Sequence, residues 1–152
     1  MTTIMQAAFA WKDAQANFTQ TVGTAMMEEK DQLAAVIVEQ QENEHKDSAG
    51  NALRQYSKPY KAHKASLGLS TETTLNLTGE FQQGITLRTD GENYEFESPA
   101  TTDTGELKSD WLKRWNGSEI MLPTDENKSV MWGIIKPTVV ENLAQQTGCG
   151  II

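Results

Sequence analysis

The carboxylates of Glu92, Glu95 and Glu97 come nearest to a catalytic pattern in this sequence. Two carboxyl groups on either side of a bond can act as general acid and general base. Glu95 and Glu97, however, alternate with Tyr94 and Phe96, so we expect them on the solvated face of a strand, away from any cleft. The sequence also lacks the common nucleophile, phosphate-binding and zinc-protease motifs. We therefore predict that the protein is not an enzyme.

Metal and cofactor ligands are equally scarce. The two histidines, His45 and His63, and the single cysteine, Cys149, have no spacing that would bring three or four ligands to one metal ion. The acidic residues within 39–47 lack the ligand order of a calcium loop, and we expect this polar run to fray into an exposed loop. One cysteine cannot form an internal disulfide, which is typical of chains that fold in a reducing compartment. We predict no metal and no cofactor.

Positive charge is concentrated in one segment in the middle of the chain, where basic side chains alternate with two tyrosines. The members are Lys46, Arg54, Tyr56, Lys58, Tyr60, Lys61, His63 and Lys64. The chain as a whole has 21 acidic and 13 basic residues and a net charge of −8, which disfavours binding to phosphates. We therefore expect Lys58, Lys61 and Lys64 to contact an acidic surface on a partner or neighbouring subunit; direct DNA contact is the alternative.

The N-terminal residues, from 4 to about 44, carry apolar side chains at helical spacing, Trp11 and Phe18 among them. An unbroken helix of that length would measure roughly 60 Å, which exceeds the width of a domain of this size. Gly23 and the charged residues 28–31 therefore mark an expected bend or break. Two interpretations are open: two helices fold onto one core, or one helix projects and contacts neighbouring subunits through Trp11 and Phe18.

Residues 50–85 combine a capped helix with an apolar stripe. Ser57 can cap a short helix that begins near Pro59 and ends at Gly68. Leu77, Phe81 and Ile85 follow at i, i+4 and i+8, which predicts one apolar helical face, and Gly79 would allow a neighbouring element to approach closely. The residues to which we assign an architectural role are Tyr56, Tyr60, Leu77, Gly79, Phe81 and Ile85.

The pattern Tyr-Ser-x-x-Tyr with following lysines, then Leu-Thr-Gly-x-Phe-x-x-x-Ile, resembles the tail-component proteins of tailed bacteriophages, also called the virion morphogenesis or tail-completion family. The match covers about a quarter of the chain, and Gly84 stands where that family more often has a small polar residue. The resemblance implies a structural virion protein of the tail or neck, concerned with tail completion or head–tail joining. It also implies other neck and tail proteins as partners, a sixfold or twelvefold homo-oligomeric ring, DNA only as it passes through a channel, and a location in the virion after assembly in the host cytoplasm.

The second half of the chain predicts a hairpin and further elements. Residues 85–97 alternate apolar and polar side chains around Asp90-Gly91, which is typical of a tight hairpin turn. A helix is expected over residues 105–115, capped by Asp103 or Thr104, with Trp111 and Trp115 as core anchors or as a ligand platform. Residues 129–135 predict an internal strand, and a capping box at residues 138–141 predicts a last helix.

These elements predict an α+β fold: a long N-terminal helix, either continuous or bent, before a small antiparallel sheet with two or three short packing helices. We expect a single domain over residues 1–152, with a helical arm at 1–45 and an α+β body at 50–148. Without an uninterrupted apolar run, neither a signal peptide nor a membrane span is expected. A virion ring subunit is the leading hypothesis, and a small acidic cytosolic adaptor or ligand-binding module is the alternative.

Overall fold

The computed structural model describes residues 4–90 and 93–148, and the chain is α+β as predicted. The N-terminal region forms three consecutive helices: α1 (Ile4–Ala16), α2 (Phe18–Glu28) and α3 (Lys30–Glu42). The break at Glu29 falls in the charged segment where one was predicted, whereas the break at Asn17 was not foreseen. Gly23 does not interrupt the helix and lies buried within α2.

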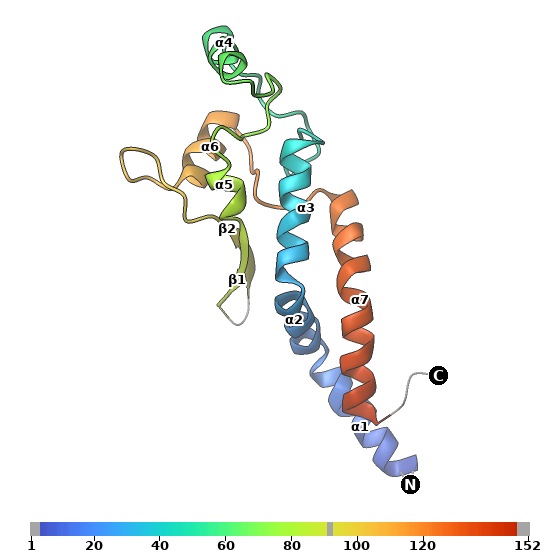
Figure 1. The fold of residues 1–152 in the computed structure, drawn as a ribbon. Coiled ribbons are helices and arrows are strands. Elements are labelled where there is room, and N and C mark those ends of the chain that lie inside the picture. Colours follow the sequence, from blue (N-terminus) through green and yellow to red (C-terminus); the bar gives the residue numbers. More distant parts are fainter. Residues whose placement is uncertain (1–3, 91–92, 149–152) are drawn as a thin grey trace.

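Helix α7 (Asp125–Thr147) runs back along the three N-terminal helices, so that two long helical layers lie side by side (Figure 1). Thr124 caps its first turn by accepting a hydrogen bond from the Asn127 amide. The strand predicted at residues 129–135 is therefore wrong, because a short apolar run does not distinguish a buried strand from a helix. The capping box is wrong too: Thr138 lies inside α7, just after Pro137, and donates its hydroxyl to Glu29.

The predicted hairpin is present as β1 (Thr86–Thr89) paired antiparallel with β2 (Tyr94–Glu97). Leu87 lies opposite Phe96, and these side chains point toward the core, while Arg88 and Glu95 point to solvent. Part of the predicted turn and Glu92 lie outside the described residues. The hairpin packs against α3 on the side opposite α7, so α3 lies between the hairpin and α7 (Figure 1).

Three short helices complete the body: α4 (Lys58–Ser66), α5 (Glu80–Gln83) and α6 (Lys108–Asn116). Ser57 caps α4 as predicted. Helix α6 starts later than expected, so the predicted cap at Asp103 or Thr104 is wrong: the residue at the cap position is Leu107, whose side chain cannot accept a hydrogen bond. Gly117 ends α6, as predicted, in a left-handed conformation.

The helical stripe predicted at Leu77, Phe81 and Ile85 does not form, because α5 is only one turn long. Phe81 and Ile85 are buried in the core, whereas Leu77 precedes the helix and is 38% exposed. Gly79 does not mediate a close helix contact: it precedes α5 with φ at +81°, a backbone conformation that glycine adopts without strain. The core itself lies between α3, α7 and the hairpin, where Leu33, Ile37, Phe81, Ile85, Leu87, Ile135 and Val139 meet.

Two fully buried glutamines join α3 to the start of α7. The side-chain oxygen of Gln40 accepts hydrogen bonds from the Thr124 amide (2.9 Å) and the Asn127 side chain (3.1 Å), and its nitrogen donates to the Leu122 carbonyl (3.1 Å). Gln41 donates to the Ile120 carbonyl at 2.9 Å. The exposed, frayed loop predicted over residues 39–47 is therefore wrong at these positions: both glutamines are buried and donate hydrogen bonds to backbone carbonyls, while the side-chain oxygen of Gln41 has no partner among the described residues.

Asp47 is a third buried polar residue of the same segment. Its Oδ1 accepts hydrogen bonds from the Asn51 amide (2.8 Å) and the Ala49 amide (3.0 Å), and its Oδ2 accepts one from the Ser118 hydroxyl (2.7 Å). Burial alone would raise the pKa of the Asp47 carboxyl, but these hydrogen bonds outweigh burial and lower that pKa. The charged form of Asp47 therefore stabilises the fold.

Candidate functional site

Helix α1 presents large apolar side chains to solvent. Ile4 is 90% exposed, Met5 70%, Phe9 61% and Trp11 54%, whereas Ala14 is the one buried residue of α1. Met5, Phe9 and Lys12 follow at i, i+4 and i+7, so they share one face of the helix, with Ile4 and Ala8 beside them. We call the residues Ile4, Met5, Ala8, Phe9 and Lys12 the arm face.

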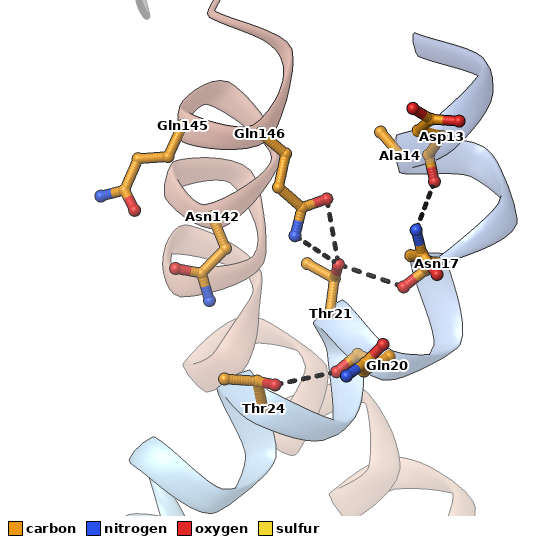
Figure 2. Close-up of a pocket in the computed structure, with 9 residues that line it drawn as sticks. All are labelled: Asp13, Ala14, Asn17, Gln20, Thr21, Thr24, Asn142, Gln145 and Gln146. Atoms are coloured by element: carbon orange, nitrogen blue, oxygen red, sulfur yellow. Dashed lines mark hydrogen bonds between the residues drawn. The ribbon is translucent and has the colours of Figure 1, made fainter. Parts of the chain in front are cut away.

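Beneath α1, a polar pocket of about 600 Å³ separates α1 and α2 from the end of α7. Figure 2 shows that it is lined mainly by amide and hydroxyl side chains: Asp13, Asn17, Gln20, Thr21, Thr24, Asn142, Gln145 and Gln146. Gln146 and Thr21 are hydrogen-bonded across it at 3.0 Å. Apart from the Asp13 carboxylate, the pocket offers neutral amide and hydroxyl groups. Because the pocket lies between α1 and α7 and its lining is mainly polar, large apolar side chains contribute little to the packing of the end of α1 against α7.

Helices α4, α5 and α6 lie away from α1, toward the other end of the molecule (Figure 1). Residues of these helices and of the loops beside them line a second apolar surface. Two adjoining hollows of about 720 Å³ and 290 Å³ share four of their lining residues. We call them together the aromatic cleft, and its main apolar lining residues are Tyr56, Tyr60, Leu75, Leu77, Phe81, Trp111, Leu112 and Trp115.

The rings of the aromatic cleft contact one another in sequence. Tyr60 meets Tyr56 edge-on with centroids 4.8 Å apart, Tyr56 lies 5.7 Å from Trp115, and Trp115 stacks on Trp111 at 6.4 Å. Trp115 packs partly against the core, as predicted, but Trp111 is 44% exposed, so its prediction as a core anchor is wrong. A rigid aromatic wall of this kind suits an apolar side chain of a partner.

The rim of the aromatic cleft carries charge. Glu80 and Lys108 form an ion pair at 2.9 Å, whereas the Asp103 carboxylate has no hydrogen-bond or ion-pair partner among the described residues. Both carboxylates are exposed.

The three lysines that the sequence assigned to a contact surface differ in their exposure. Lys58 is exposed, and Lys61 is partly exposed and donates to Gln55 at 2.9 Å. Lys64, however, is 1% exposed, so its assignment to a contact surface is wrong.

The Lys64 ammonium is held inside the body by neutral groups. It donates to the Asn76 carbonyl (2.7 Å) and the Thr74 hydroxyl (3.2 Å), and it lies 4.8 Å from the centroid of the Tyr56 ring. Burial lowers the pKa of Lys64. This lysine therefore fixes the loop after α4 rather than meeting a partner.

The motif residues Tyr56 and Tyr60 form the inner wall of the aromatic cleft. The Tyr56 hydroxyl accepts a hydrogen bond from the Leu75 amide at 2.9 Å, and burial raises the pKa of both tyrosines. Trp11 and Phe18, which the sequence suggested as contacts, are 54% and 44% exposed. Sequence reasoning missed Ile4, Met5 and Phe9 as exposed groups, because an apolar helical stripe does not show which of its members the rest of the chain covers.

Within residues 4–90 and 93–148, no helix is long and apolar enough to cross a membrane. The same residues contain no group of three or more His, Cys, Asp and Glu side chains that could hold a metal ion. No family model, curated protein or solved structure matches the chain. The resemblance to phage tail-component proteins therefore stays a prediction.

Proposed function

We propose that this protein is a structural subunit that assembles with copies of itself, as expected of a bacteriophage tail or neck protein. The observation that carries the proposal is the arm face together with Trp11: four large apolar side chains of α1 are more than half exposed. Because monomeric proteins rarely expose continuous apolar surface of this kind, such a patch marks an interaction site.

The exposed area is large enough to matter energetically. With side-chain areas of about 150–250 Å² each, Ile4, Met5, Phe9 and Trp11 leave roughly 500 Å² uncovered. A stable interface takes about 800 Å² from each partner, so these four side chains would supply more than half of one partner's share. At about 25 cal/mol per Å², covering them is worth on the order of 10 kcal/mol before the cost of association is subtracted.

The assignment to a phage tail or neck rests on the sequence resemblance, and the structure adds a compatible surface. In this proposal the neighbours are other neck and tail proteins, Lys58 and Lys61 lie on a contact surface, and DNA passes through a channel that the ring encloses. A net charge of −8 favours such a role, because an acidic lining would not retain a polyanion.

Self-association is tested by measuring the mass of the purified chain by sedimentation velocity over a wide range of concentration and salt. We expect species larger than the 16.9 kDa subunit, and a double substitution Met5→Asp and Phe9→Asp should reduce them to monomer. Val130→Asp, at a 51% exposed position of α7, is the matched control and should assemble normally. A chain that stays monomeric throughout, or a double variant that assembles like the parent chain, would contradict the proposal.

The virion assignment needs a separate experiment. Mass spectrometry of purified particles from a culture that produces this chain should find it in the particles in several copies per tail. Its absence from purified virions, with the chain present in the lysate, would count against a tail or neck role and leave self-association unaffected.

One observation favours a second function, a ligand-binding module. The aromatic cleft has the volume and the aromatic lining of a small-molecule site. In that case Leu77→Arg would abolish ligand binding and leave the mass of the assembled protein in solution unchanged.

A further inference from the structure

We propose that the aromatic cleft of one subunit receives the arm face of α1 from the next subunit. This inference rests on the proposed self-assembly and adds to it the identity of both contact surfaces. The occupant of the cleft is thus a second copy of this chain, bound as an apolar helix in a groove.

The two surfaces match in kind. Helices that bind grooves present apolar anchors at i, i+4 and i+7 spacing, and α1 offers Met5 and Phe9 at i and i+4, with Ile4 beside them. The aromatic cleft offers side chains that are partly open to solvent, including Leu77 and Trp111. An apolar helix face and an apolar groove each remain uncovered in one subunit, and each would cover the other.

The charges match as well. The arm face continues to Lys12, and no described residue gives its ammonium a hydrogen-bond or ion-pair partner. The rim of the cleft carries Asp103, whose carboxylate is similarly unpaired among the described residues. A helix seated in the cleft through Met5 and Phe9 would extend its basic end past the apolar contact, where an acidic rim favours it.

A subunit cannot fill its own cleft with its own α1. Figure 1 shows α1 at one end of the molecule and α4 and α6 at the other, with the length of α7 between them. The contact must therefore join two different patches on two copies. Such a heterologous contact repeats from subunit to subunit and gives a ring when the rotation closes. The pairing of arm face and aromatic cleft is therefore compatible with a ring, but it does not require the ring to close.

The test uses two full-length variants, each lacking one of the two surfaces. The arm variant is Met5→Asp with Phe9→Asp, and the cleft variant is Leu77→Arg with Asp103→Lys. All four positions are exposed, so the fold should tolerate the changes; circular dichroism and thermal unfolding of each variant verify this. Leu122→Arg, 48% exposed and outside the cleft, is the control for an added arginine and should assemble like the parent chain.

Each variant alone should be monomeric, but an equimolar mixture should form a complex of one arm variant and one cleft variant. In that complex the intact arm of the cleft variant occupies the intact cleft of the arm variant, and growth stops at twice the 16.9 kDa subunit mass. A symmetric contact between two α1 helices predicts something different: the cleft variant would assemble alone, and mixing would add nothing.

The outcomes separate the two proposals. If the parent chain assembles and the cleft variant assembles equally well, the pairing is wrong and self-assembly stands. If the parent chain never assembles, both fail. A finer measurement reverses the charges: Lys12→Asp or Asp103→Lys alone should raise the dissociation constant about three- to tenfold, and the two together should restore it toward the parent value. Independent, additive effects of the two reversals would overturn the charge pairing.

Discussion

The contact between Gly23 of α2 and Tyr94 of β2 allows a sharp test of how the hairpin is held against the N-terminal helices. A Cβ atom at position 23 would lie 1.8 Å from the Tyr94 hydroxyl oxygen and 2.7 Å from the ring carbon that bears it. Both distances are shorter than any normal non-bonded contact. Gly23→Ala therefore forces either the tyrosine ring or the hairpin to move.

The expected magnitude is the difference of two opposing effects. Alanine is more favourable than glycine inside a helix by about 0.5–1 kcal/mol, whereas overpacking a core contact costs about 1–3 kcal/mol. We expect Gly23→Ala to lower the free energy of unfolding by about 1–2 kcal/mol. When Tyr94→Ala removes the ring, the same substitution should instead raise that free energy by up to about 1 kcal/mol. Tyr94→Phe should give an intermediate result, because the 2.7 Å contact with the ring carbon remains.

The assay is urea unfolding followed by circular dichroism, with the four chains arranged as a double-mutant cycle. The arm variant Met5→Asp, Phe9→Asp serves as the background, so that self-association does not contribute to the measured stability. The reasoning predicts a coupling energy of about 2–3 kcal/mol between positions 23 and 94. A Gly23→Ala chain that is more stable while Tyr94 is present, or a coupling near zero, would refute it.

Three further predictions concern buried polar groups. Asp47→Asn should lower the free energy of unfolding by about 1 kcal/mol at neutral pH. Because the folded-state pKa of Asp47 lies below the unfolded value of 3.8, this difference should shrink as pH falls below 3.8. A difference in unfolding free energy that stays constant with pH would contradict this prediction. Gln40→Ala should lower the urea-unfolding free energy by about 2–4 kcal/mol, since it leaves the partners of three hydrogen bonds unpaired, and Gln32→Ala, on the exposed side of α3, is the control. Acetylation of the native protein, read by mass spectrometry, should modify Lys58 and spare the buried Lys64, with equal modification of the two as the contrary result.

The elements that local chemistry specifies could be predicted from the sequence. Ser57 at the start of α4, Gly117 at the end of α6 and the alternating pattern of the hairpin each act within a few residues, so their structural effects are visible in the sequence. The same is true of the break at Glu29, where charged residues interrupt the apolar stripe.

Elements that depend on distant partners could not be predicted in this way. The segment at 129–135 belongs to a helix because Met131 and Ile135 face the N-terminal helices, and short-range alternation carries no trace of that contact. The polar sequence around Gln40 predicts an exposed side chain, but Gln40 is buried because Asn127, far along the chain, supplies a hydrogen-bond partner. Lys64 likewise becomes buried through the loop that carries Asn76, which no spacing rule brings to it.

The candidate site likewise contains residues that the local sequence identifies and residues that only the folded chain brings together. The sequence identified Tyr56, Tyr60, Leu77 and Phe81 as one architectural motif, and the structure places all four on the aromatic cleft. It offered Trp111 and Trp115 as a ligand platform but did not place them in one cleft with Tyr56 and Tyr60, because that pairing joins α4 to α6 across some 50 residues of chain.

The weak attachment of α1 connects the stability of this helix to assembly. Helix α1 has 13 residues, and only one of them, Ala14, is buried. An isolated helix of that length is marginal in water, so α1 depends on what it packs against. In a single subunit it packs against α7 through small side chains and the polar pocket shown in Figure 2. Insertion of Met5 and Phe9 into a neighbouring cleft would supply the missing apolar contact. Assembly would therefore order the same helix that makes the interface, and each added subunit would be stabilised by the one that receives its arm.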